Sequence, residues 1–70
     1  MEFSAALKYI RAAHPLSQEQ LARKLNVSFA TINRWENEVS KPRAMAVDLV
    51  GYYIKENNLD IFIDVKPQRS

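Results

Sequence analysis

Apolar residues near the start of the chain recur at the spacing of a helix. Phe3, Leu7 and Ile10 stand at i, i+4 and i+7, so their side chains share one face of an α-helix. Pro15 limits this helix, because the residue before a proline avoids helical conformation. The pattern therefore predicts an amphipathic helix with one buried face that ends before residue 15.

A second helix is predicted to begin at Gln18. Ser17 directly precedes it, and serine is among the best N-cap residues. Gln20 lies three residues beyond that cap, where its side chain can complete a capping box. The inner face of this helix is supplied by Leu21, Ala22 and Leu25.

A sharp turn and a third helix follow. Asn26 stands at the turn, and after glycine asparagine best tolerates the left-handed conformation. Ser28 is the next N-cap, for a helix over about 29–37. On a helical wheel the residues of this helix fall on two opposite arcs, of which one is expected to face outward and the other inward. The first arc is Phe29, Ala30, Asn33, Arg34 and Asn37, and the second is Thr31, Ile32 and Trp35.

The segment Lys41-Pro42-Arg43 is predicted to open a fourth helix. Proline is tolerated in the first turn of a helix, and Ser40 is the expected cap. Asn57 and Asn58 are expected to end this helix. Its apolar face is expected to consist of Met45, Leu49, Val50, Tyr53 and Ile54.

The last segment has a different period. Leu59, Ile61, Ile63 and Val65 alternate with Asp60, Phe62, Asp64 and Lys66, and a period of two favours a strand. A single strand needs a partner for its backbone groups, and the sequence contains no second strand. We therefore expect 59–65 either to pack back on the domain as an extended arm or to pair with its copy across a two-fold axis.

The stretch 18–37 resembles the helix-turn-helix of the Cro/repressor-like (XRE-type) family. The small Ala22 lets two helices cross closely, Asn26 makes the turn, and large apolar residues lie where the helices meet. The entry Leu-Ser-Gln-Glu-Gln-Leu-Ala and the exit Ile-Asn-Arg-Trp-Glu-Asn are matched at the separation seen in the family. The resemblance covers about 3–56 and implies an all-α, lambda-repressor-like bundle of four to five short helices. It also implies binding to double-stranded DNA, commonly as a two-fold homodimer.

The resemblance implies a set of DNA contacts. Asparagine can pair with adenine and arginine with guanine, whereas Phe29 and Ala30 offer only apolar contact, which favours thymine methyl groups. Asn37, Lys41 and Arg43 are expected to hold the phosphate backbone. If two copies pair through the tail, their half-sites lie one turn of DNA apart, about 34 Å. The implied contact residues are Gln18, Ser28, Phe29, Ala30, Asn33, Arg34, Asn37, Lys41 and Arg43.

The chain departs from the family pattern at two positions. Asn26 stands where glycine is usual, which is a mild change. Glu38 also replaces a glycine; it places an acid beside the expected DNA surface and removes the easiest C-cap, so the loop after the third helix is expected to follow a different path. The resemblance further implies that Glu36 pairs with Arg11 of the first helix.

Several residues also have a purely structural interpretation. Trp35 points inward on the wheel and is expected in the core. Phe29 is open between a core and a contact position, and Arg34 could be a solvated charge. His14 has no second group at metal or catalytic spacing, and there is no glycine-rich phosphate loop, so we expect a non-enzyme without cofactor or metal.

Composition limits the size and the class of protein that the chain can form. The chain has 70 residues, of which 47% are hydrophobic, enough for one small domain. It has no cysteine, which suits a reducing cytoplasm, and neither an apolar run long enough for a membrane span nor a signal-peptide pattern is found. The net charge is +2. Residues 1–43 hold seven Lys/Arg against four Asp/Glu, so the basic character lies with the helix pair.

The sequence therefore predicts a DNA-binding domain over 1–58 and an extended arm or linker over 59–70. The expected function is sequence-specific binding of double-stranded DNA by a cytoplasmic transcriptional regulator, a repressor or an autoregulator. Two alternatives stay open. One is a protein-interaction module on the same scaffold, favoured by Phe29, Ala30 and Glu38. The other is a DNA-binding fragment of a longer protein. No small-molecule substrate and no membrane partner is expected.

Overall fold

The computed structural model describes residues 1–39 and 41–64, and these residues form a small all-helical bundle. The predicted fold class is therefore confirmed, with four helices and no strand in the described ranges. None of these helices is long and apolar enough to cross a membrane. The helices are α1 (Phe3–Ala13), α2 (Gln18–Leu25), α3 (Phe29–Glu36) and α4 (Ala44–Glu56).

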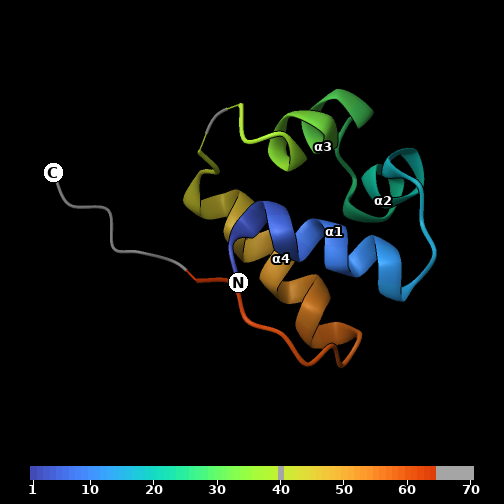
Figure 1. The fold of residues 1–70 in the computed structure, drawn as a ribbon, viewed down its shortest axis with the longest axis vertical. Helices are drawn as coiled ribbons and strands as arrows, with labels where there is room; N and C mark the ends of the chain where they lie inside the picture. Colours follow the sequence, from blue (N-terminus) through green and yellow to red (C-terminus); the bar gives the residue numbers. More distant parts are fainter. Residues whose placement is uncertain (40, 65–70) are drawn as a thin grey trace, which may run out of the picture.

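The helix α1 lies at the centre of the bundle (Figure 1). The short helices α2 and α3 pack on each other, and α3 also packs on α1. The helix α4 crosses on the other side and contacts α1 and α2. This arrangement leaves the outer side of α3 facing away from the rest of the chain.

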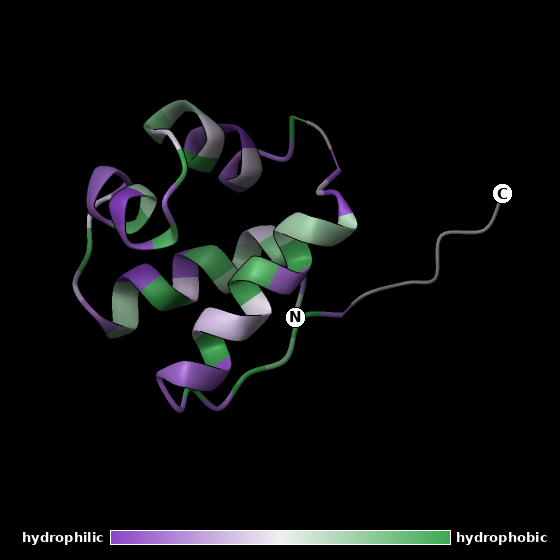
Figure 2. Cartoon of the chain, turned by 180° about the vertical axis from the view of Figure 1, so that it is seen from behind, coloured by the Kyte–Doolittle hydropathy of each residue, from purple (hydrophilic) through white to green (hydrophobic). Residues whose placement is uncertain are grey.

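The core forms where these helices meet. Leu7, Ile10, Leu21, Ile32 and Val50 are fully buried, and the surrounding apolar side chains close over them. The ring of Trp35 meets that of Phe3 edge-on, with 5.2 Å between their centroids, so Trp35 packs against the core as expected. In Figure 2, apolar positions dominate α1 and the first half of α4, whereas α2 is mostly polar.

The predicted helix starts at α2 and α3 are confirmed. The Ser17 hydroxyl accepts a hydrogen bond from the Gln20 backbone N–H at 3.0 Å, and the Gln20 side chain accepts one from the Ser17 N–H at 2.8 Å. This is the expected capping box. Ser28 caps α3 through the N–H of Thr31 at 3.1 Å. The directions in which α2 and α3 leave the turn between them are thus fixed by local polar contacts.

Three helices end on a residue with left-handed backbone. These residues are Asn26, Glu38 and Asn58, with φ of 60°, 56° and 54°. In each case the next N–H closes the helix by bonding back to the carbonyl five residues earlier, as in a Schellman motif. The bonds are Val27 to Ala22 at 2.9 Å, Val39 to Arg34 at 3.1 Å and Leu59 to Ile54 at 3.0 Å.

The fourth helix begins later than the sequence pattern indicates. It starts at Ala44, with Arg43 extended as the N-cap and no side chain capping it. The expected cap Ser40 lies outside the described residues. The prediction of the apolar face is also wrong at two positions, because Met45 is 83% exposed and Leu49 is 36% exposed. Val50, Tyr53 and Ile54 lie on the buried side of α4 as predicted, and Ala46 and Val47 lie there in place of Met45 and Leu49.

The tail lies along the domain without forming a strand in 59–64. Leu59, Ile61 and Ile63 pack against the core, and Phe62 is 83% exposed. The alternation thus identified the inward side chains of 59–64 correctly. The predicted strand was wrong, because no second strand lies beside this segment in residues 1–39 and 41–64. The backbone N–H of Asp64 donates to the Met1 carbonyl at 2.7 Å, which fits the packed-arm alternative. Val65 lies outside the described residues.

Candidate nucleic-acid interface

The outer face of α3 is open to solvent. Ile32 is fully buried and anchors the helix, whereas Ala30, Arg34 and Asn37 are exposed. Phe29 is 51% exposed, which places it outside the core. The wheel prediction for this helix therefore matches its observed orientation.

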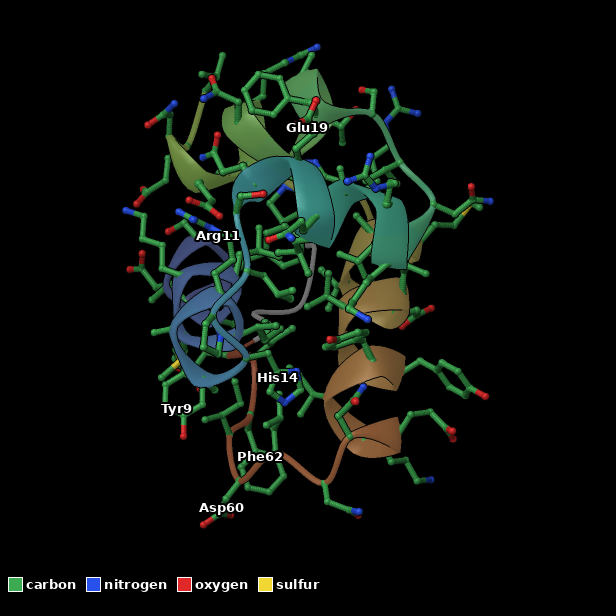
Figure 3. The ribbon with its side chains drawn as sticks, turned by 90° about the vertical axis from the view of Figure 1, so that its right-hand side faces the viewer. Tyr9, Arg11, His14, Glu19, Asp60 and Phe62 are labelled. Carbon is green, nitrogen blue, oxygen red and sulfur yellow. The ribbon has the colours of Figure 1, made fainter. Side chains whose placement is uncertain are left out.

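An ion pair between the half-buried Arg11 and the buried Glu36 holds α3 against α1. The Arg11 guanidinium donates two hydrogen bonds to the Glu36 carboxylate, from Nε at 2.7 Å and from Nη2 at 2.9 Å. Figure 3 shows Arg11 on the side of α1 that faces α2 and α3. Such a two-point pair fixes orientation as well as distance. The pairing implied by the family resemblance is confirmed.

The pKa values of both groups reflect this pair. Burial alone would raise the pKa of Glu36, which is only 3% exposed. The hydrogen bonds from Arg11 and Gln18 outweigh burial and leave that pKa below its ordinary value. The hydrogen bond to Glu36 likewise raises the pKa of Arg11. Glu36 is therefore an anion when the protein is folded at neutral pH.

A series of hydrogen-bonded amide side chains connects Glu36 to the exposed face of α3. Gln18 Nε2 donates to Glu36 Oε1 at 3.1 Å. Asn33 Nδ2 donates to Gln18 Oε1 at 3.2 Å, and Asn37 Nδ2 donates to Asn33 Oδ1 at 3.1 Å. We call Glu36, Gln18, Asn33 and Asn37 the amide relay. It joins the N-terminus of α2 to the exposed face of α3.

The charge of Glu36 sets the direction of the amide relay. An ionised carboxylate only accepts hydrogen bonds, so Gln18 must present its NH₂ group to it. The oxygen of Gln18 is then left to accept from Asn33, and the oxygen of Asn33 accepts from Asn37. Each NH₂ group has two hydrogens, and within the described residues only one of them is used. Every amide of the relay therefore has one N–H that meets no acceptor within the described residues.

Arg34 and the two basic residues after α3 are also exposed. Within residues 1–39 and 41–64 the ion pairs are Arg11 with Glu36 and the Met1 amine with Asp64, so Arg34 has no carboxylate partner there. Lys41 and Arg43 lie in the segment between α3 and α4. The Ser28 hydroxyl is occupied by capping and by a 2.9 Å hydrogen bond to Thr31 Oγ1.

Glu38 differs from its expected role. Its backbone adopts the left-handed conformation that glycine would provide, so α3 is capped although glycine, the easiest residue for that position, is absent. Its carboxylate accepts a hydrogen bond from the Ser4 hydroxyl at 2.9 Å. Ser4 lies in the first turn of α1, where a negative charge is favourable. The acid is thus bound to α1.

Comparison with family models identifies the family to which the chain belongs. The helix-turn-helix model matches residues 7–49, which is more than half of the chain and contains α2, α3 and the turn between them. The chain belongs to the Cro/C1-type (XRE) helix-turn-helix family. Members of this family are DNA-binding domains. No curated protein and no solved structure matches the chain.

The helix-turn-helix brings four of the nine expected contact residues together. Gln18, Asn33 and Asn37 meet in the amide relay, and Arg34 lies beside them on α3. Sequence reasoning missed the relay itself. The spacing of Asn33 and Asn37, i and i+4 on one helix, is a signal for their contact. The link from Gln18 to Glu36 joins two helices and has no local signal.

The described residues contain no group of three His, Cys, Asp or Glu side chains that could hold a metal ion. His14 instead lies against α4, with its Nδ1 3.2 Å from the Tyr53 hydroxyl. Burial raises the pKa of Tyr53. This pair links the end of α1 to α4.

Proposed function

We propose that this helix-turn-helix protein binds duplex DNA in a sequence-specific way and regulates transcription, as a repressor or an autoregulator. The observation that carries the proposal is the exposed face of α3, whose amides are oriented by the amide relay and whose Arg34 has no partner in the described residues. Groups held in advance lose little freedom on binding. We further propose that it acts by binding and not by catalysis.

The contacts follow from the side chains on α3. Arg34 offers the paired donors that recognise guanine O6 and N7. Asn33 offers a free N–H to an acceptor such as adenine N7, and its oxygen already accepts from Asn37. Phe29 and Ala30 offer apolar surface to a thymine methyl group. We therefore expect Arg34 to contribute most to sequence preference.

Lys41 and Arg43 are proposed to contact phosphates. They are exposed and follow α3 directly, and phosphate contacts position a protein without reading sequence. We expect two copies to act together, in the cytoplasm, where the absence of cysteine suits the reducing conditions.

A salt titration tests the phosphate contacts. Binding of the full chain to a mixed duplex pool is measured by fluorescence anisotropy at several salt concentrations. We expect Lys41→Ala and Arg43→Ala each to weaken binding and to reduce the salt slope by about 1. Lys8→Ala, at an exposed position on α1, is the matched control and should leave the slope unchanged. A slope that does not respond to Lys41 or Arg43 contradicts their role.

The second candidate is a protein-interaction module, and the 51% exposure of Phe29 favours it. An exposed aromatic side chain at the start of α3 can fill an apolar pocket of a partner. The same titration separates the two functions, because an interaction module has no affinity for duplex DNA even at low salt.

A further inference from the structure

The amide relay ends at the surface in a side chain with unused polar groups. Exposure rises along the relay, from the buried Glu36 at 3% through two half-buried amides to the exposed Asn37. Asn37 donates one N–H to Asn33 Oδ1 at 3.1 Å. Its side chain forms no other hydrogen bond within residues 1–39 and 41–64, so its oxygen Oδ1 and one N–H remain. These are the two groups that asparagine uses to pair with adenine.

We propose that Asn37 reads an adenine and that Glu36, which lies beneath the surface, determines this choice through the amide relay. Oδ1 of Asn37 accepts from the adenine N6 amino group, and the remaining N–H donates to adenine N7. Gln18 and Asn33 transmit the orientation, so with Glu36 they are positioning residues that do not contact this base. The inference rests on the proposed DNA binding, and it assigns Asn37 to a base and not to the phosphate backbone.

The direction of the relay is enforced from its buried end. A carboxylate only accepts hydrogen bonds, and that of Glu36 accepts from Gln18 as well as from Arg11. If the Asn37 amide turned over, its oxygen would face the oxygen of Asn33, and no hydrogen joins two acceptors. If the whole relay reversed, the oxygen of Gln18 would face the carboxylate. Either reversal loses a hydrogen bond and brings two oxygens together.

A fixed direction makes an ambiguous amide selective. An asparagine that rotates freely can offer its oxygen and one N–H to adenine, or its NH₂ group to guanine, whose O6 and N7 are both acceptors. In the relay one hydrogen of the Asn37 NH₂ group is already bound to Asn33, and Oδ1 would face guanine O6. Guanine therefore leaves acceptors unpaired, and a contact that penalises the wrong partner is a source of specificity.

Asn37 lies where a duplex on α3 can reach it. It is the C-cap residue of α3 and follows Arg34 by three positions, and residues three apart are neighbours on a helix surface. Both side chains are exposed. The acid that follows, Glu38, is hydrogen-bonded to Ser4 on α1. The two side chains thus offer one continuous surface to the edges of bases.

Base substitutions in a selected duplex test the role of Asn37. A duplex is selected from a random pool with the natural chain, each base pair is replaced in turn, and affinities are measured for the natural chain and for Asn37→Ala. We expect one position at which the natural chain prefers adenine to guanine by about tenfold or more, and Asn37→Ala should abolish that preference. An equal loss of affinity for every duplex would make Asn37 a phosphate contact and overturn the inference.

Two variants of Gln18 test the relay without removing the Arg11–Glu36 ion pair. Gln18→Lys still donates to Glu36 but offers only donors to Asn33, so the outer amides must reverse. The NH₂ group of Asn37 is then free, and the preference at its position should shift from adenine to guanine. Gln18→Met interrupts the relay and should reduce the preference to about twofold or less. The response to Arg34→Ala at its own base pair should be unchanged in both variants.

Glu36→Gln tests the buried end of the relay. A neutral amide at this position permits either direction, so the preference for adenine over guanine should also fall to about twofold or less. Asp60→Asn removes a carboxylate from the exposed tail and is the matched control, which should keep the preference. Circular dichroism measures the folded fraction, and if Glu36→Gln does not fold, the two Gln18 variants decide the matter.

Nuclear magnetic resonance of the free protein follows the relay without DNA. Gln18→Lys should shift the side-chain amide signals of Asn37, whereas Asp60→Asn should leave them in place. Signals that ignore Gln18→Lys overturn the inference.

The outcomes separate this inference from the proposed function. A chain that binds no duplex overturns both. A chain that binds DNA with a preference that depends on Arg34, but not on the Gln18 and Glu36 variants, overturns the inference alone.

Discussion

Single residues with unusual environments determine how α3 is held. Glu36 is a buried anion that accepts hydrogen bonds from Arg11 and Gln18, and breaking such a pair leaves an uncompensated group. Asn26 and Glu38 adopt left-handed backbone at the two ends of the helix-turn-helix segment. The orientation of the recognition surface thus depends on a few side chains beneath it and beside it.

Glu36→Gln is expected to lower the free energy of unfolding by about 2–4 kcal/mol at pH 7. The pKa of Glu36 is lowered by folding, so its contribution is fully present above the ordinary carboxyl pKa of 4.5 and is lost as the pH falls through the folded pKa. The difference between the variant and the natural chain should therefore shrink towards pH 3.

Urea unfolding followed by the fluorescence of Trp35, the single tryptophan, measures this difference at each pH. Asp60→Asn, at an exposed position in the tail, is the control and should have little effect at any pH. An equal loss at pH 3 and pH 7 would show that the charge of Glu36 is not what stabilises the fold.

Asn26→Ala is expected to lower the free energy of unfolding by about 1 kcal/mol, because a Cβ without a polar side chain is unfavourable at a φ of 60°. Asn26→Gly should cost little or nothing, since glycine adopts this conformation freely. Thermal unfolding of the two variants checks this. Equal destabilisation by alanine and glycine would mean that the amide of Asn26, and not its backbone conformation, is what the turn requires.

At the level of elements, local signals account for α1, α2 and α3. Caps and helical spacing are short-range features, so the sequence was sufficient to place Ser17, Asn26 and Ser28 correctly. The start of α4 was not predictable in this way, because it has no side-chain cap. Which of its two apolar stripes is buried depends on how it crosses α1, and that crossing is set by distant residues.

The tail and Glu38 also show where prediction from local sequence signals stops. The alternation in 59–64 gave the inward side chains, but whether an extended segment becomes a strand depends on a partner strand elsewhere. Glu38 seldom adopts left-handed backbone by preference, and its hydrogen bond to Ser4 joins residues 34 positions apart. Contacts between distant segments decided both outcomes, and no local pattern carries that information.

Ser17→Ala tests the contribution of a cap to the whole helix α2. It removes the acceptor for the Gln20 N–H, and we expect a loss of about 1 kcal/mol in the free energy of unfolding. Ser17→Asp retains an acceptor and adds a charge that the helix start favours, so it should be near neutral. Chemical unfolding of both variants is the measurement, and an alanine variant as stable as the aspartate variant would contradict the role of the capping box.

At the level of the whole molecule, α1 separates two surfaces. On one side lies α3 with Arg34 and the amide relay, and on the other lies the exposed face of α4 with the tail (Figure 1). The first surface carries the proposed DNA contacts, and the second lies apart from them.

The most direct test of the central claim is selection of bound duplexes from a random pool, followed by affinity measurements with Arg34→Ala. We expect the natural chain to prefer the selected duplex, and Arg34→Ala to lose about tenfold or more of that preference while unfolding as the natural chain does. If Arg34→Ala keeps both its affinity and its sequence preference, α3 is not the surface that reads DNA.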